Sequence, residues 1–85
     1  MYKINFTRQA AKSIRKIPKH TSDLIREKLE QLASDPFDKA LDIVKLQNRP
    51  GYRMRVGNWR ILYELQKENL IIIVLNIASR GDVYR

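Results

Sequence analysis

The chain has 85 residues, a length that predicts a single domain over residues 1–85 with a core of modest size. It has no cysteine, which excludes a disulfide framework and a cysteine metal site, and its hydrophobic content of 44% is that of a folded protein. Seventeen Lys and Arg residues against nine Asp and Glu residues give a net charge of +8, which favours a polyanionic partner such as nucleic acid.

The sequence predicts neither a secretory signal nor a membrane span. The start of the chain, "MYKINFTRQAAKSIRK", lacks a long apolar run, and the longest uncharged apolar run, "LIIIVLNIAS", is too short to cross a bilayer. Together with the absence of cysteine, these features lead us to expect a cytoplasmic protein that makes no use of a membrane.

The first third of the chain predicts a strand followed by two helices. Alternating residues indicate a strand over 2–6, and Thr7 is a suitable N-cap for a helix that reaches Ile17 and is ended by Pro18. A second helix is expected to begin near residue 21 or 22 and to run to about Ala33, which gives an αα-hairpin. The side chains expected to be buried are Ala10, Ile14 and Ile17 in the first helix and Leu24, Ile25, Leu29 and Leu32 in the second.

The remainder of the chain predicts strands. Residues 35–50 look like a connector, with Val44 to Leu46 as a candidate short strand, and strands are expected over 52–56, 59–66 and 70–79. The expected fold is therefore α+β with the order β-α-α-β-β-β, a mostly antiparallel four-stranded sheet with the αα-hairpin packed on one face.

The stretch "YRMRVGNWRILYEL" predicts a two-residue hairpin with Gly57-Asn58 in its turn. Because side chains alternate along strands, Arg55 is then directly opposite Arg60, and Arg53 is diagonal to Arg60. The face toward the helices is expected to hold Tyr52, Met54, Val56, Trp59, Ile61, Tyr63 and Leu65, and the other face Arg53, Arg55, Arg60, Leu62 and Glu64.

A three-residue loop over 67–69, with Asn69 in the left-handed conformation, is expected to lead into the last strand. This loop pairs Gln66 with Leu70 and places Asn76 opposite Arg60, so that Arg80 continues the same face. The side chains expected on the core side of this strand are Ile71, Ile73, Leu75 and Ile77.

Four arginines are thus expected on one sheet face, where like charges directly opposite each other cost roughly 0.2–1 kcal/mol per pair. A phosphate would relieve that repulsion, because guanidinium offers paired donors in a fixed plane. The alternative is a solvated sheet face that happens to be rich in arginine.

No metal or nucleophile constellation is visible in the sequence. His20 is the only histidine and is expected in the turn between the helices, and the three glycines lie far apart, so there is no phosphate-cradling loop. RNA, however, carries its own nucleophile in the 2′-hydroxyl, and arginines can stabilise the charge that develops during its attack. Tyr84 could assist proton transfer or stack on a base, or it could pack on the sheet edge.

The segments "KLQNRPGYRMRVGNWRILYEL" and "SRGDVYR", with the strand and helices before them, resemble the RelE/ParE superfamily of bacterial and archaeal toxins. The resemblance implies the toxin of a type II toxin–antitoxin pair. RelE-type members cut mRNA in the ribosomal A site by metal-free attack of the 2′-hydroxyl, which inhibits translation. The catalytic positions of the family match Arg53, Arg55, Arg60, Arg80 and Tyr84, and no cofactor is implied.

Two departures from the family pattern affect the expected chemistry. Well-studied RelE members carry lysines at the positions of Arg53 and Arg55, and an arginine cannot give up its proton as a lysine can. The identity of the general base is therefore an open question at the level of sequence. The segment from Arg80 to Tyr84 is also shorter than in relatives and lacks a basic residue that some of them carry.

The resemblance also implies a partner, a small, acidic and partly disordered antitoxin that covers the arginines or the helix pair. Two other functions remain open at the level of sequence. The first is a ParE-like inhibitor of DNA gyrase without nuclease activity, and the second is a basic nucleic-acid-binding module without toxicity.

Overall fold

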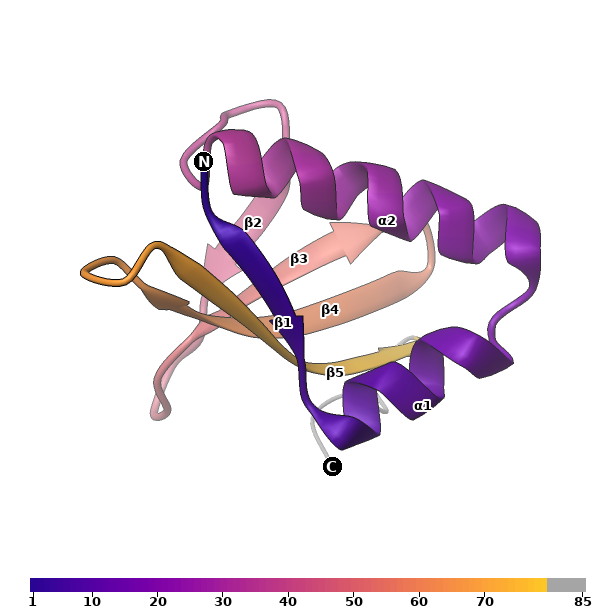
Figure 1. Cartoon of the computed structure of the whole chain (residues 1–85). Helices are drawn as coiled ribbons and strands as arrows, with labels where there is room; N and C mark the ends of the chain where they lie inside the picture. The colour runs from indigo at the N-terminus through magenta and orange to yellow at the C-terminus, as the bar shows by residue number, and fades with distance from the viewer. Residues whose placement is uncertain (80–85) are drawn as a thin grey trace.

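Two helices cover one face of a five-stranded sheet (Figure 1). The computed structural model describes residues 1–79. In chain order its elements are β1 (Lys3–Phe6), α1 (Arg8–Lys16), α2 (Lys19–Ser34), β2 (Asp42–Lys45), β3 (Tyr52–Val56), β4 (Trp59–Gln66) and β5 (Ile71–Ser79). The strands lie in the order β1-β5-β4-β3-β2, with β1 parallel to β5 and the other pairs antiparallel. The expected α+β class and the helix pair are confirmed.

The expected number of strands, four, is wrong, because β2 adds a fifth strand at the edge next to β3. The candidate strand over 44–46 is displaced, since β2 spans Asp42–Lys45 and pairs Asp42 with Arg55 and Val44 with Arg53. Pairing with β3 fixes this register, and it leaves Leu46 to begin the loop that returns to Gly51. Edge strands are often short and polar, as β2 is, and such strands leave a weak signal in the sequence.

Thr7 joins the start of α1 to the sheet. Its Oγ1 accepts a hydrogen bond from the backbone N–H of Ala10 at 3.2 Å, as an N-cap does, and donates one to the carbonyl of Leu75 at 3.0 Å. Ala10, Ile14 and Ile17 are buried as expected, so the helix lies with this stripe against β5 and β1. The expected cap and the buried stripe of α1 are confirmed.

The second helix begins at Lys19, two residues before the expected start. Proline is tolerated at a helix start, where no N–H is needed, so the chain resumes a helix directly after Pro18. Burial follows a stripe at helical spacing that comprises Ser22, Ile25, Leu29, Leu32 and Ala33. Leu24 lies off this stripe and is 40% exposed, which makes its expected burial wrong.

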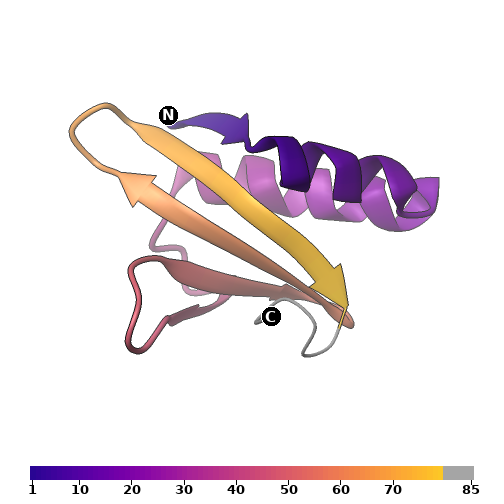
Figure 2. The ribbon, with the colours of Figure 1, turned by 90° about the horizontal axis from the view of Figure 1, so that it is seen from below.

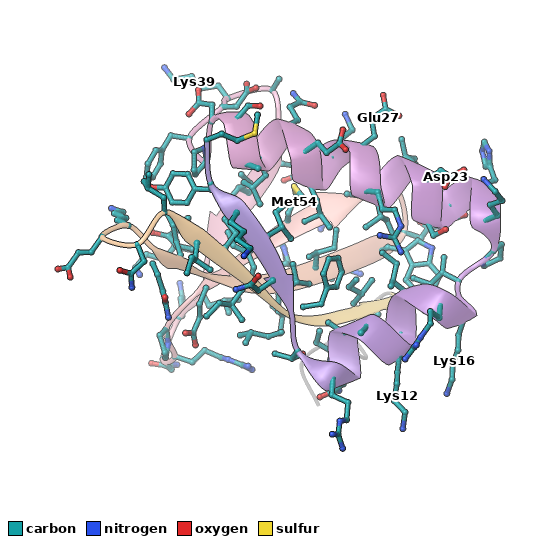
Figure 3. All side chains as sticks on the ribbon, in the orientation of Figure 1. Lys12, Lys16, Asp23, Glu27, Lys39 and Met54 are labelled. Atoms are coloured by element: carbon teal, nitrogen blue, oxygen red, sulfur yellow. The ribbon has the colours of Figure 1, made fainter. Side chains whose placement is uncertain are left out.

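The core lies between the helices and the sheet, and Figure 3 shows Met54 in this space beneath α2. Met54, Ile61, Ile72 and Val74 are all fully buried. Tyr63 is 1% exposed and stacks on Tyr52 with ring centroids 5.5 Å apart. Burial, with Tyr52 as a smaller cause, raises the pKa of Tyr63 well above its usual 10.0.

The hairpin between β3 and β4 has the expected register, with Val56 opposite Trp59 and Arg55 opposite Arg60. Gly57 in the turn has a φ of +59°, the left-handed conformation that this hairpin turn requires. The division of side chains between the two faces of β3 and β4 is therefore also as expected.

The register between β4 and β5 differs from the expectation. Gln66 pairs with Ile71, and the residue with positive φ in the loop is Leu70 at 56°, whereas Asn69 was expected there. Arg60 is opposite Ala78, so its expected pairing with Asn76 is wrong. The core side chains of β5 are Ile72, Val74 and Ile77, and Ile71, Ile73 and Leu75 are only partly buried.

A β-bulge at Leu75 explains this pattern. Leu62 pairs with Asn76 and the next residue, Tyr63, pairs with Val74, so Leu75 has no partner position on β4. The longer loop shifts β5 by one residue, and the bulge adds a second shift in the same direction. After two shifts the alternation of faces is the expected one again, so that Ile77 faces the core and Asn76 faces away from it. The Asn76 side chain accepts a hydrogen bond from the N–H of Ile77 at 2.9 Å.

No helix within residues 1–79 is long and apolar enough to cross a membrane.

We expect Gly51→Ala to destabilise the protein more than Gly57→Ala. Both glycines have positive φ, 106° at Gly51 and 59° at Gly57. A Cβ at Gly51 would lie 2.8 Å from the carbonyl oxygen of Tyr63, whereas a Cβ at Gly57 would have no atom within 4 Å. Left-handed strain alone costs about 1–2 kcal/mol, so Gly51→Ala should cost about 3 kcal/mol or more. Urea denaturation measures the free energy of unfolding of both variants. Equal losses of stability would contradict the close approach of Gly51 to the backbone of Tyr63.

We expect the free energy of unfolding to fall less at alkaline pH in the Tyr63→Phe variant than in the wild-type protein. In the unfolded chain this tyrosine loses its proton near pH 10, whereas the raised pKa keeps it protonated in the folded protein. The contribution of the protonated Tyr63 hydroxyl to stability is complete below pH 10. Above pH 10 the free energy of unfolding falls by up to about 1.4 kcal/mol per pH unit. Urea midpoints between pH 9 and pH 11 should fall less steeply in the Phe variant, and parallel curves would contradict the burial of this hydroxyl.

Candidate functional site

The sheet surface turned away from the helices carries Arg53, Arg55 and Arg60, and we call it the arginine face. Figure 2 shows strands β3, β4 and β5 seen from below, with α1 in front of α2. Strand alternation brings the three guanidinium groups to this face, as the sequence indicates. Arg80 and Tyr84, the two other expected site residues, lie outside the described residues.

One row of side chains crosses the arginine face as Asp42, Arg55, Arg60 and Ala78. Side chains directly opposite each other in a sheet have Cβ atoms about 4.5–5.5 Å apart, so the side chains of Arg55 and Arg60 leave the sheet next to each other. The Asp42 carboxylate lies 4.0 Å from Nε of Arg55, and these two side chains are 56% and 45% exposed. A solvent-exposed ion pair of this length is weak, so the Asp42 carboxylate only partly offsets the positive charges of Arg55 and Arg60.

The next row crosses the face as Val44, Arg53, Leu62 and Asn76. Leu62 is only 1% exposed although it points away from the helices, and the Nε atom of Arg53 is buried. Arg53 is therefore held by its surroundings, while Arg55 extends into solvent. Charges act over longer range where water is excluded, so an anion bound beside Arg53 would be attracted more strongly than on an open surface.

A hollow of about 290 Å³ adjoins Arg53 at the edge of the sheet. It is lined by Val44, Lys45, Leu46, Gln47, Arg49 and Arg53, a set with three cations and no acid. From the sequence alone, Lys45 and Arg49 lie in a connector over residues 35–50 and are given no role. Lys45 ends β2 and Arg49 lies within the turn "NRPG", which returns the chain toward Arg53, so this turn is the signal that could have found them.

Asp42 is the other functional residue that sequence reasoning missed. The candidate strand over 44–46 excluded it, so Glu64 was the only acid expected on this face. In the structure Glu64 is opposite Ile73, beyond the row of Arg53, and Asp42 is the acid beside the paired arginines. Counting outward from the "NRPG" turn, where the N–H of Leu46 donates a hydrogen bond to the carbonyl of Gly51, leads to the pairing of position 42 with Arg55.

The arginine face can bind and orient a phosphate, and it offers donors where negative charge develops. Within residues 1–79, no three His, Cys, Asp or Glu side chains gather as a metal site would require. His20, expected in the turn between the helices, lies in the first turn of α2 and is exposed, away from the arginines. The chemistry of the described site is therefore that of guanidinium groups.

Residues 4–84 match the model of a protein family described as the ParE toxin of the type II toxin–antitoxin system parDE. The chain belongs to this toxin family. ParE and RelE toxins form one superfamily, and the similar proteins come from its RelE side, so the expected membership in the RelE/ParE superfamily is confirmed.

A relative of this toxin from Methanocaldococcus jannaschii, named as the toxin RelE1, is 26% identical over 86 residues, which are 99% of this chain and 96% of the relative. RelE in the RelE–RelB complex of Pyrococcus horikoshii OT3 superposes with a TM-score of 0.81 at 25% identity, over 95% of this chain and 97% of that chain. The isolated RelE toxin of E. coli has the same fold, with a TM-score of 0.79 at 24% identity, over 99% and 92% of the two chains.

We expect Asp42→Asn to strengthen binding of a single-stranded oligonucleotide without changing stability much. The ion pair is exposed and long, so its loss should alter the free energy of unfolding by less than about 0.5 kcal/mol. The lost negative charge lies beside Arg55, so affinity should rise several-fold at low salt.

Asp23→Asn is the matched control, because it removes an exposed carboxylate from α2, where Asp23 pairs with Lys19 at 2.8 Å. The hydrogen bond from Lys19 lowers the pKa of Asp23, so this residue is charged at neutral pH. An equal rise in affinity for both variants would mean that only net charge matters, and it would count against a site at Arg55.

Proposed function

We propose that this toxin is a ribosome-dependent endoribonuclease that cuts mRNA in the ribosomal A site and thereby inhibits translation in the cytoplasm. The observation that carries the proposal is the direct pairing of Arg55 with Arg60, with Arg53 one row away on the same face. Opposed cations destabilise a sheet, and a bound phosphate removes that cost. The likeness to RelE toxins supports the choice of mRNA as the substrate.

The proposed reaction uses the 2′-hydroxyl of the RNA as nucleophile. A bond forms between this oxygen and the adjacent phosphorus while the bond to the 5′ oxygen of the next nucleotide breaks. The products are a 2′,3′-cyclic phosphate and a free 5′-hydroxyl, after one proton has left the 2′-hydroxyl and one has reached the leaving oxygen. Because the nucleophile belongs to the RNA, the reaction does not require a metal ion.

We assign Arg60 and Arg80 to the scissile phosphate, Arg53 and Arg55 to substrate position and charge, and Tyr84 to proton transfer or base stacking. Guanidinium groups remain protonated, so Arg53 and Arg55 cannot act as the base. Alignment of the 2′-hydroxyl with the phosphorus and stabilisation of charge on the phosphoryl oxygens therefore supply most of the rate acceleration in this proposal.

We also propose a cognate antitoxin that is small, acidic and partly disordered. The P. horikoshii relative forms a complex with RelB, and the +8 charge of this chain suits an acidic partner. A groove of about 210 Å³ between the two helices, lined by Phe6, Ala11, Ile14, Arg15 and Arg26, combines apolar side chains with cations. Such a surface suits an amphipathic acidic segment that folds on binding.

The alternative is inhibition of DNA gyrase without nuclease activity, and the match to the ParE family description favours it. The two functions separate in one experiment that follows mRNA and plasmid DNA in cells expressing the toxin. Cut mRNA with intact plasmid supports the nuclease, and gyrase-cleaved plasmid with intact mRNA supports the alternative.

We expect Arg60→Ala and Arg80→Ala each to reduce mRNA cutting by about 100-fold or more, the scale of losing one charge-stabilising donor. Primer extension on a defined mRNA in a translating extract measures the cuts as new 5′ ends. Arg26→Ala is the control, because Arg26 is an exposed arginine of α2 on the opposite side of the sheet. Cutting at the wild-type rate by both site variants would refute the assignment.

A further inference from the structure

Helix α1 carries a basic ridge formed by Arg8, Lys12 and Lys16, which are all exposed. These residues are four apart in sequence, so their side chains lie in one row along the helix. Figure 3 shows Lys12 and Lys16 side by side, pointing away from α2. The row is about 12 Å long, from the rise of a helix over eight residues.

No acidic side chain among residues 1–79 forms an ion pair with the basic ridge. Helix α1 contains four cations and no acid, whereas α2 contains three Lys and Arg residues and three Asp and Glu residues. The ion pairs within 4.0 Å in the described part of the chain are Lys19–Asp23 and Arg55–Asp42, and neither includes a ridge residue. The charge of the helical layer is therefore concentrated on α1.

The stability of the helix does not account for this arrangement. Like charges at a spacing of four residues repel each other along a helix. Arg8 also lies in the first turn, which contains no acidic residue, at the end of the helix dipole where a cation is unfavourable. Lys16 is favourably placed in the last turn, but Arg8 and Lys12 gain nothing from their positions. A bound anion would offset both the repulsion between the cations and the unfavourable position of Arg8 at the start of the helix.

The ridge borders a shallow hollow of about 470 Å³ that is lined by Arg8, Gln9, Lys12, Ser13 and Lys16. Gln9 and Ser13 lie one residue after Arg8 and Lys12, so amide and hydroxyl groups alternate with the cations. Contacts of this mixed kind, from Lys, Arg, Gln and Ser, are those that proteins make with phosphate and sugar oxygens.

We propose that the basic ridge of α1 binds the sugar–phosphate backbone of a structured RNA, outside the segment that is cut on the arginine face. This inference rests on the proposed function, because it takes RNA as the substrate. The ridge itself presents no apolar side chain, and an acidic peptide that folds on binding needs apolar anchors. The groove between the helices has such anchors, so an antitoxin suits that groove better and RNA suits the ridge.

The position of the ridge allows both contacts at once. Helix α1 is joined to β5 through Thr7 and Leu75, and β5 is the strand next to β4, which carries Arg60. A folded RNA on the ridge would therefore hold a neighbouring single-stranded segment near the paired arginines. Phosphate contacts of this kind position a protein on RNA without reading its sequence.

The test measures how affinity for an RNA hairpin depends on salt for the full chain and for the double variant Lys12→Gln/Lys16→Gln. Each lost phosphate contact lowers the slope of log affinity against log salt by about 0.7–1, so the slope should fall by about 1.4–2. Affinity near physiological salt should fall about tenfold. Glutamine is a good helix former, and equal thermal midpoints would show that the fold is kept.

The matched control is Lys39→Gln/Lys67→Gln, which removes the same charge. Lys67 lies 5.2 Å from the ring of Phe37, and Figure 3 shows Lys39 at the opposite end of the molecule from Lys12 and Lys16. An unchanged slope in the control, with a reduced slope in the ridge variant, supports the inference. Equal losses in both variants, or no loss in the ridge variant, would overturn it.

A protein partner on the ridge would give a different result. The ridge variant would then lose affinity for the copurified acidic antitoxin while its RNA slope stayed at the wild-type value, which also overturns the inference. Failure of the proposed nuclease is seen separately, as absence of mRNA cuts by the wild-type toxin in the translating extract, and it leaves the measured salt slopes unaffected.

Discussion

Strand pairing on both sides of β4 is the constraint on which the site depends. On one side, the Gly57-Asn58 turn sets Arg55 against Arg60, and on the other, the bulge at Leu75 shifts the register of β5 by one residue and so keeps Ile77 in the core. A slip of one residue would exchange the two faces of a strand, which would bury guanidinium groups and expose core side chains. The core therefore selects the register, and the register gathers the arginines.

The sequence predicts the part of the fold that local chemistry determines. The hairpin of β3 and β4 follows from its turn residues and the alternation beside them, and Thr7 caps α1 as its side chain indicates. The link between β4 and β5 could not be predicted in the same way. Its four-residue loop and the bulge at Leu75 depend on how β5 packs under the helices, and Asn76 faces the arginines because of the bulge and not because of the loop.

For the candidate site, the sequence predicts which arginines share a face but not which other side chains surround them. Arg53, Arg55 and Arg60 share a face, as alternation requires, but nothing in the pattern shows that Leu62 between them is buried or that Asp42 completes their row. The place of Asp42 comes from edge strand β2, which has little signal of its own. Charge is also divided between the helices, with a neutral α2 and a basic α1, and this division follows from the sequence once the bounds of both helices are known.

The parallel pairing of β1 with β5 has a consequence for biosynthesis. Lys3 to Phe6 pair with Ile71 to Val74, and Thr7 donates a hydrogen bond to Leu75, 68 residues further along the chain. Strand β1 therefore finds its place only when β5, which is made later, has emerged. A nascent chain without β5 lacks the strand on which β1 and α1 pack, so these two elements reach their places only after residue 79 has been made.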